Sequence, residues 1–395
     1  MHDRPARFAA WSRWSEAAAA RPWTVGVEEE LMLLDPGDWS LANRVGDVLD
    51  ALPEGAAAHA APETHACVLE LRTAPHGTVA EAAAQLGGLR DAVDRTLREE
   101  LGLRAAVAGM HPFAVREDVD VTSDRRYREV ESTMRALARR EPTMAQHVHV
   151  AVPDADSAVR ALDGLRGALP VILALSANSP YWHGSDSGFA SVRTPVFSMF
   201  PRIGIPRRFG RYGEYVATVA AMLRARAIPD PSFLWWDARL QPRLGTVEVR
   251  MMDAQSRLLD VAALAALVQC LVRRYAAGGR AYAPPLELLA ENRFLAARDG
   301  LEAQLLDDRR ADGRRSVRAA LAELLEDCAP DARELGCADE LADAQALAAD
   351  PGYARQRRCA ERRGPRALLA RLADEYAHPA RAMLAAWAPA GEAGL

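Results

Sequence analysis

Lysine is absent from this chain. All 49 basic residues among its 395 positions are arginine. A Schiff-base lysine is therefore excluded, and so is a Walker-type phosphate loop, which needs a lysine after its glycines. Any phosphate group must be bound by arginine, by backbone N–H groups or by a metal ion. The formal net charge of −5 predicts no broad basic surface, so we expect no nucleic-acid partner.

Cysteine and long apolar runs are scarce as well. The five cysteines are odd in number and lack C-x-x-C spacing: Cys67, Cys270, Cys328, Cys337 and Cys359. This argues against a disulfide framework or a zinc ribbon and favours a reducing cytoplasm. No apolar run is long enough to span a bilayer, and residues 1–23 lack the continuous apolar segment of a signal peptide. We therefore predict a cytoplasmic protein without a membrane partner.

What the chain does contain is enough hydrophobic residues, 50%, to build a large core in one domain or two. The expected helices and strands follow one another without a regular βαβ order, which predicts the α+β class. We divide the chain into an N-terminal arm (1–21), a main body that holds all expected strands (22–280) and a mostly helical region packed on the same domain (281–395). Within the main body, one long helix is expected between Asp154 and Pro180. Residues 181–213 are expected to form a functional loop without periodic structure.

Charged residues alternate with apolar ones on four expected strands. Residues i and i+2 of a strand share a face, which pairs these residues: Glu28 with Glu30, Glu70 with Arg72, His147 with His149, and Glu248 with Arg250. The opposite faces are apolar, except that Glu29 lies with Val27 and Leu31. A solvated sheet face is the simpler explanation for any one strand. Glutamate, however, is depleted in strands, so its use on several of them favours a functional face.

The chemistry of these residue types points to a cation. Adjacent carboxylates repel one another unless a positive charge lies between them. Glutamate oxygens with an occasional imidazole are ligands that suit Mg²⁺ or Mn²⁺. Arginines beside such a site would bind anionic phosphate or carboxylate oxygens. The sequence therefore predicts a metal-lined sheet face that binds a polyphosphate.

Eight motifs in order resemble a known family. Between about Trp23 and Gly300 they read "GVEEEL", "ELRTAP", "GMHPFA", "HVHV", "ALSANSPYWHGSDSGFASVR", "WWDARL", "GTVEVRMMD" and "ENRFLAARDG". The chain resembles the carboxylate–amine ligases of the type-2 glutamate–cysteine ligase group, whose sheet is similar to that of glutamine synthetase. The resemblance implies a largely antiparallel sheet with one face forming the active site, flanking helices, a catalytic part over 22–280 and a helical C-terminal part.

The resemblance also implies an activity. Enzymes of this family use ATP to phosphorylate a carboxylate, and an amine then displaces phosphate to give an amide. The default pair is the γ-carboxyl of glutamate with cysteine, the cofactors are ATP and Mg²⁺ or Mn²⁺, and a homodimer is the expected assembly. Three alternatives stay open: a natural-product tailoring ligase with another acid or amine, a phosphotransferase on the same fold, and a binding or scaffold protein without activity.

Individual roles follow from the same resemblance. The expected metal ligands are Glu28, Glu30, Glu70, His147 and Glu248. His149 and Arg298 are expected at the nucleotide phosphates, Arg250 at the transferring γ-phosphate, and Arg193 and Arg72 at substrate carboxylate or phosphate. Asn178 and Ser179 are expected to shape the acceptor pocket.

The chain departs from the family pattern at a few positions, namely Gln146, Ser187, Phe189 and Asp299. We expect these positions near the acceptor substrate, so they leave the identity of the acceptor open. Two other histidines, His111 and His183, are expected to be structural.

Overall fold

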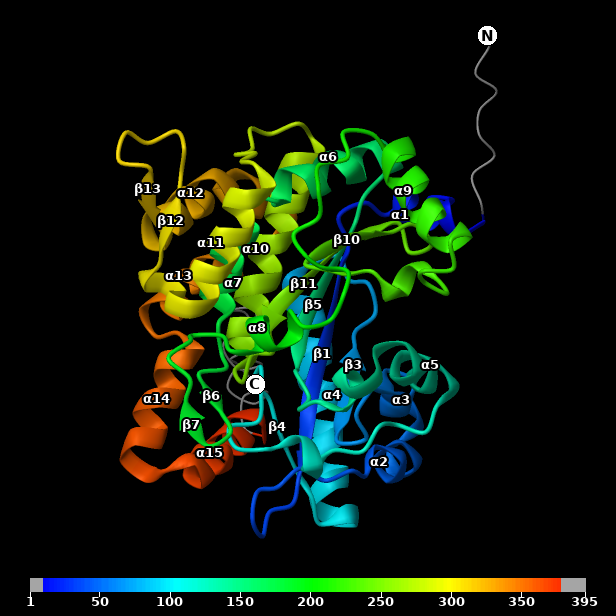
Figure 1. The fold of residues 1–395 in the computed structure, drawn as a ribbon, viewed down its shortest axis with the longest axis vertical. Coiled ribbons are helices and arrows are strands. Elements are labelled where there is room, and N and C mark those ends of the chain that lie inside the picture. The colour runs from blue at the N-terminus through cyan, green and yellow to red at the C-terminus, as the bar shows by residue number, and fades with distance from the viewer. Residues whose placement is uncertain (1–9, 378–395) are drawn as a thin grey trace, which may run out of the picture.

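A seven-stranded antiparallel sheet forms the centre of the molecule. The computed structural model describes residues 10–377, and β1 (Val25–Leu34) runs through the middle of the sheet (Figure 1). The strand order is β10 (Ala238–Gln241), β11 (Thr246–Asp253), β5 (Ala145–Ala151), β1, β3 (Val68–Arg72) and β2 (Ala60–Pro62), and β4 (Arg104–Ala106) also pairs with β1. Every pairing in this sheet is antiparallel, as predicted.

The apolar face of the sheet is covered by helices. Side chains such as Val27, Leu69, Val148 and Val247 are at most 2% exposed, and each such burial stabilises the fold by about 1.5–3 kcal/mol. The covering helices that contact these strands are α4 (Val79–Thr96), α6 (Ala155–Leu165), α7 (Leu169–Ser176) and α10 (Leu258–Ala276). The alternation of the strands therefore leaves the opposite, polar face free to line a cavity.

A buried ion pair under the sheet links its strands. Glu29 is fully buried on the apolar face and accepts two hydrogen bonds from Arg90 of α4, one of them at 2.9 Å. The same guanidinium donates to the backbone oxygens of Gln255 and Ser256, which follow β11. Arg90 therefore fixes β1 relative to the end of β11 on the apolar face of the sheet.

The segment between Asp154 and Pro180 is two helices, so the prediction of one long helix is wrong. The first, α6, ends at Leu165 and α7 starts at Leu169. Pro170 lies in the first turn of α7, where its missing N–H is not needed, whereas in a continuous helix its ring would clash with a carbonyl one turn earlier. Gly167 lies in the break, where a Cβ would be 2.2 Å from the backbone oxygen of Tyr282.

Residues 181–213 also differ from the expectation, because they contain short regular elements. These are β6 (Tyr181–Trp182), β7 (Ser185–Asp186), α8 (Arg193–Phe197), β8 (Ile203–Gly204) and the start of α9 (Tyr212–Arg224). β6 and β7 form a small antiparallel pair, and β8 pairs in parallel with β9 (Trp235–Trp236). Two-residue strands are too short for any periodicity to reveal.

The remaining elements surround this centre. In the first half of the chain these are α1 (Glu16–Ala20), α2 (Val45–Ala51), α3 (Glu54–Ala57) and α5 (Arg125–Met134). After residue 280 they are α11 (Leu286–Asp299), β12 (Gln304–Leu306), β13 (Arg314–Ser316), α12 (Val317–Leu335), α13 (Ala338–Ala349), α14 (Gly352–Arg363) and α15 (Pro365–Ala377). Figure 1 shows α11, α12 and α13 on one side of the sheet and α5 on the other. The β12–β13 hairpin was not predicted.

Both predicted end regions pack on the main body where the structure describes them. In the arm, Trp14 donates from Nε1 to the backbone oxygen of Val152 at 2.9 Å. At the other end, α12 and α13 pack on α10, and α15 packs on β4 and α4. Residues 1–9 of the arm and 378–395 of the helical region lie outside the described residues. The domain boundaries remain a prediction.

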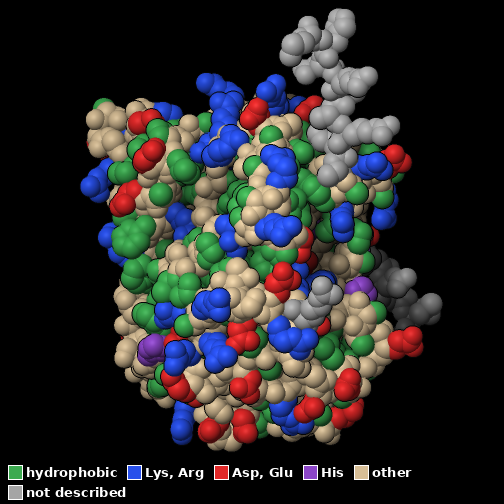
Figure 2. Space-filling view, turned by 45° about the vertical axis from the view of Figure 1, so that its right-hand side comes forward, with side chains coloured by type: hydrophobic (Ala, Val, Ile, Leu, Met, Phe, Trp, Pro, Cys, Tyr) green, Lys and Arg blue, Asp and Glu red, His purple; other side chains and the backbone are tan. Residues whose placement is uncertain are grey.

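The surface carries both charge signs close together. On the face drawn in Figure 2, arginine side chains and acidic side chains are interspersed. Many exposed arginines have a nearby carboxylate, as in the pairs Arg44–Asp47 and Arg371–Glu375. This arrangement fits the small net charge of the sequence.

Candidate active site

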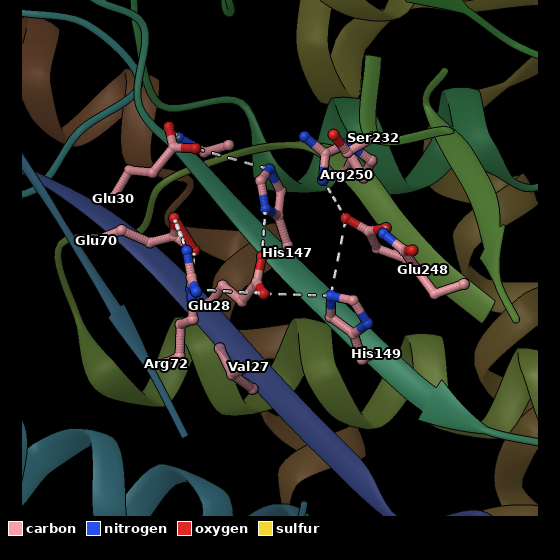
Figure 3. A network of polar contacts seen from close by, with 12 residues as sticks. Val27, Glu28, Glu30, Glu70, Arg72, His147, His149, Ser232, Glu248 and Arg250 are labelled. Carbon is pink, nitrogen blue, oxygen red and sulfur yellow. Dashed lines mark hydrogen bonds and ion pairs between the residues drawn. The ribbon is translucent and has the colours of Figure 1, made fainter. Parts of the chain in front are cut away.

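The polar residues of β1, β3, β5 and β11 converge on one face of the sheet. Strand register places Glu28 opposite both His147 and Arg72, Glu30 opposite Glu70, and Glu248 opposite His149. Figure 3 shows these side chains pointing toward one another from neighbouring strands. Together they form the floor of a cavity of about 540 Å³, which is large enough for a small-molecule substrate.

One end of this floor is suited to hold a cation. Glu28, His147 and Glu248 each present a ligand atom, and these atoms all lie within 4.8 Å of one another. His147 Nδ1 is 2.9 Å from Glu28 Oε2, and His149 Nε2 is 3.5 Å from Glu28 Oε1. Two carboxylates with an imidazole form a donor set that fits Mg²⁺ or Mn²⁺.

Arginines complete this end of the floor. Arg250 Nη1 donates to Glu248 Oε1, and Arg239 Nε donates to Glu248 Oε2 at 2.6 Å. We call Glu28, His147, His149, Glu248, Arg239 and Arg250 the balanced end, because carboxylates and cationic groups alternate in it. Arg239 was not predicted, although Arg239 and Gln241 alternate with apolar residues on β10 and could have been found by that signal.

The charges of the balanced end hold its carboxylates ionised. Burial alone would raise the pKa of Glu28, but His149 and His147 outweigh it, so the pKa lies well below its usual range. Burial likewise opposes ionisation of Glu248, and Arg239 and Arg250 bring its pKa well below the usual range. The pKa of His149 is raised, because Glu248 and Glu28 outweigh the effect of burial.

The other end of the floor, which we call the acidic end, consists of Glu30, Glu63 and Glu70. Glu30 Oε2 accepts a hydrogen bond from the backbone N–H of Ala145 at 2.8 Å, and Glu70 accepts two from Arg72, at 2.6 and 2.9 Å. Burial is the main reason that the pKa of Glu30 is raised. Burial, Glu70 and Glu30 together raise the pKa of Glu63 well above its usual value.

Glu63 was missed by the sequence prediction. It follows directly on β2, an edge strand of three residues, where no alternation identifies the inward face. Only the pairing of β2 with β3, which places Ala61 opposite Glu70, brings Glu63 to the floor.

Arg193 lies in the wall of the cavity. It is 5% exposed, donates from Nη1 to the backbone oxygen of Met251 at 3.0 Å and lies 3.8 Å from Asp253. Its Nε has no hydrogen-bond partner among the described residues, and burial lowers the pKa of the guanidinium. A buried N–H without a partner is costly, so this donor fits a ligand group in the cavity.

Three predicted site residues do not reach the cavity. Arg298, in the last turn of α11, pairs with Asp299 at 2.7 Å and stacks over Phe294, outside the cavity lining. Asn178 donates to the backbone oxygen of Ala254, and Ser179 donates to Asp253, both in the buried interior. The structure gives the predicted roles of these three residues no geometric support.

The positions that depart from the family pattern also lie outside the cavity lining, which corrects the expectation that they lie near the acceptor. Gln146 is fully buried and donates to the backbone oxygen of Val261. Ser187 donates to the backbone oxygen of Pro180, and Phe189 packs edge-on against Phe294. Asp299 pairs with Arg298. None of these four residues therefore lines the cavity.

His111 and His183, two histidines outside the cavity lining, both have partners within the protein. His111 Nε2 is 2.8 Å from the backbone oxygen of Trp39, and its Nδ1 accepts from the backbone N–H of Ala114 at 2.9 Å. His183 Nε2 lies 2.6 Å from Glu141 Oε1. Asp237 is 3% exposed, lines the cavity and pairs with Arg293.

Within residues 10–377, no helix combines the length and the hydropathy needed to cross a membrane.

Known proteins resemble the chain in sequence and in fold. Residues 24–378 match the model of the family described as "Glutamate-cysteine ligase family 2(GCS2)". A Rubrobacter xylanophilus protein named "Putative glutamate--cysteine ligase 2-3" is 46% identical over 82% of this chain and 88% of its own length. A Frankia alni protein named "Putative glutamate--cysteine ligase 2-1" is 38% identical over 86% of this chain and 91% of its own.

Two crystal structures share the fold at low sequence identity. The glutamate–cysteine ligase of Francisella tularensis in complex with AMP superposes with a TM-score of 0.66 at 13% identity, over 92% of this chain and 93% of the other. A bifunctional glutathione synthetase from Pasteurella multocida gives 0.67 at 14% identity, over 92% of this chain and 53% of the other. These matches confirm the predicted fold class. The predicted enzyme class, an ATP-dependent ligase, is confirmed by the family match: the chain belongs to glutamate–cysteine ligase family 2.

Proposed function

We propose that this chain joins a carboxylic acid to an amine through an acyl phosphate, at the expense of ATP. The observation that carries the proposal is the arrangement of Glu28, His147 and Glu248 within 4.8 Å, beside Arg239 and Arg250, on the floor of a cavity of about 540 Å³. A carboxylate is a poor electrophile, and phosphorylation gives it a leaving group that an amine can displace. Such a reaction needs dense positive charge around the transferring phosphoryl group.

Glu28, His147 and Glu248, whose ligand atoms lie within 4.8 Å of one another, would hold one divalent cation. Glu30, Glu63 and Glu70 line the same cavity and would supply carboxylates to a second. Bound Mg²⁺ or Mn²⁺ supplies Lewis acidity toward phosphate oxygens and neutralises their charge.

The protein's own groups then orient and stabilise the reactants. Arg250 is positioned for the transferring phosphoryl group, because it lies on the floor against Glu248 and is only partly exposed. His149 lies beside Glu28 and Glu248, which raise its pKa, and there it would bind nucleotide phosphate. Arg193, with its free Nε, would bind a carboxylate or phosphate oxygen from the wall. Arg72, on the acidic end, would hold a substrate carboxylate once a cation occupies that end.

Glutamate and cysteine are the substrate pair that we propose first. The names of the relatives given above support this pair. A tailoring ligase with another acid or amine is the second candidate, since the aromatic side chains Phe197 and Trp235 line the cavity and would contact an apolar acceptor. A cytoplasmic location, predicted from the cysteine pattern, and a homodimer, implied by the resemblance, remain predictions.

The proposal is tested by the dependence of ADP release on substrates. A ligase releases ADP continuously only when acid and amine are both present, and the mass of the product equals acid plus amine minus water. A phosphotransferase releases ADP with one acceptor alone and yields a phosphorylated product. Absence of ADP release with a broad panel of acids and amines would contradict both enzymatic candidates and favour a binding protein.

A further inference from the structure

Arg126 differs from the other arginines that line the cavity. Six of these lie within 4.0 Å of a carboxylate: Arg72, Arg140, Arg193, Arg239, Arg250 and Arg293. Arg126 also lines the cavity, but no carboxylate of residues 10–377 forms an ion pair with its guanidinium. It is therefore the lining arginine whose charge the described chain does not neutralise.

Neutral groups hold the Arg126 side chain in place. Nη1 donates to the hydroxyl oxygen of Ser232 at 2.9 Å, and Cζ lies 5.6 Å from the centre of the Phe233 ring. A guanidinium has five N–H donors, so this one hydrogen bond leaves most of them available. Arg126 is exposed, so these donors are accessible to a ligand. The backbone is fixed independently, because the Arg126 N–H donates to the Asp124 carboxylate that caps α5.

Arg126 is connected to the balanced end through Ser232 and Arg239. The backbone oxygen of Ser232 accepts a hydrogen bond from Arg239 Nη1 at 2.9 Å, and Arg239 pairs with Glu248 on the floor. Ser232 and Arg250 both line the cavity. Arg126 comes from α5 and Ser232 from the turn Pro231–Phe233, so the two walls of the cavity meet at this hydrogen bond. Arg126 and Glu248 thus line one cavity, and Arg126 contributes to it from the α5 side.

We propose that Arg126 is an anion-binding residue that determines substrate specificity. Its planar fork matches the oxygens of a carboxylate or a phosphate. Either source fits this chemistry: a nucleotide phosphate, or a carboxylate on the acid or the amine. The assignment rests on the proposed function, because it takes these molecules as the ligands of the cavity.

A structural alternative makes a different prediction. If Arg126 only ties α5 to the turn at Ser232, then removing the serine hydroxyl should have the same effect as removing the guanidinium. If Arg126 binds an anion, the Ser232→Ala variant keeps the charge and should bind substrates nearly as the wild type does. The two variants therefore separate a wall contact from a ligand contact.

The experiment compares four variants in steady-state kinetics and in calorimetric titrations with ATP, glutamate and cysteine in the presence of Mg²⁺. Arg126→Gln is expected to raise KM and Kd for one anionic substrate about tenfold or more, with kcat within about threefold, because a charge-assisted hydrogen bond is lost. Arg126→Lys should lie between this variant and the wild type. Ser232→Ala should stay within about threefold of the wild type. Arg139→Gln is the matched control, because Arg139 is exposed on the same side of the cavity, pairs with Glu131 and does not line the cavity.

The substrate that responds identifies the source of the anion. A shift for ATP alone indicates a phosphate, whereas a shift for the acid or the amine alone indicates its carboxylate and should disappear when the corresponding amide is used. Unchanged binding in Arg126→Gln, or an equal effect in Ser232→Ala, would overturn the assignment. If the wild type binds these ligands but forms no amide, the proposed function fails while the titrations still decide the role of Arg126. Binding of none of the three anions to the wild type would overturn the assignment as well.

Discussion

The two ends of the cavity floor are built from the same residue type but differ in charge. At the balanced end, histidine and arginine hold Glu28 and Glu248 ionised, and the pKa values of both carboxyls are lowered. At the acidic end, Glu30 and Glu63 have raised pKa values, chiefly because they are buried. The difference teaches that the protein surrounds Glu28 and Glu248 with several cationic groups, whereas at the acidic end Arg72 pairs with Glu70 and burial keeps the pKa values of Glu30 and Glu63 high.

The largest expected effect comes from breaking the balanced end at Glu28. In Glu28→Gln one anionic ligand of the candidate cation site is lost, and we expect kcat to fall by about 1,000-fold or more, as for other losses of transition-state charge stabilisation. The measurement is ADP release, together with Mn²⁺ titration followed by electron paramagnetic resonance. Glu326→Gln, on the exposed face of α12, is the control and should behave as the wild type. Full activity of Glu28→Gln would show that the balanced end is not the reaction centre.

The next effect concerns the buried ion pair that links β1 to the end of β11 on the apolar face of the sheet. Arg90→Ala leaves Glu29 as a buried charge without a partner, and we expect the free energy of unfolding to fall by about 3–5 kcal/mol. The free energy of unfolding is measured by urea denaturation. The double variant Glu29→Met with Arg90→Met removes both charges and should recover most of the loss. A loss below about 1 kcal/mol in Arg90→Ala would mean that the pair does not hold β1 in place.

A smaller effect is expected at the acidic end. Glu63→Gln keeps the shape of the side chain and removes an anionic ligand, so we expect one Mn²⁺ fewer per chain and a decrease in kcat of about tenfold to a hundredfold. Titration counts the bound ions, and Glu54→Gln on α3 serves as an exposed acidic control. An unchanged number of ions would limit the cation site to the balanced end.

The most gradual effect is a pH dependence of stability at His111, whose ring nitrogens contact backbone groups. Burial lowers the pKa of His111 to about 4, whereas its value in the unfolded chain is about 6.5. Between these values the unfolded chain binds a proton that the folded chain does not. The contribution of His111 is therefore complete above pH 6.5 and is lost as the pH falls toward 4, by up to about 1.4 kcal/mol per pH unit. The slope should be smaller in His111→Gln, measured by denaturation at several pH values. Equal slopes would show that His111 does not titrate in this range.

Alternation along single strands predicted much of the floor. It placed Glu28, Glu30, His147, His149 and Glu248 on polar faces opposite buried valines and leucines, and the structure brings these residues together. Alternation says nothing about register, however. That Glu28 lies between His147 and Arg72 depends on the pairing of three strands far apart in the sequence.

The errors have physical causes as well. Glu63 follows an edge strand too short to show a period, and Arg126 lies on a helix whose orientation toward the cavity depends on tertiary packing. The break at Pro170 was overlooked because the apolar character of α6 continues into α7. The expectation that Gln146 and Asp299 lie near the substrate rested on their place in family motifs. Both side chains point away from the cavity, because Gln146 bonds the buried backbone and Asp299 pairs with Arg298.

The guanidinium of Arg90 touches nothing in the cavity, yet it spans the strand that carries Glu28 and the turn that follows the strand of Glu248. The spacing between these two carboxylates is therefore set by the interior of the protein. Residues of α4 lie on the opposite side of the sheet from the cavity. Substitutions there should therefore change the cation preference of the enzyme at smaller perturbations than those that change its substrate affinity.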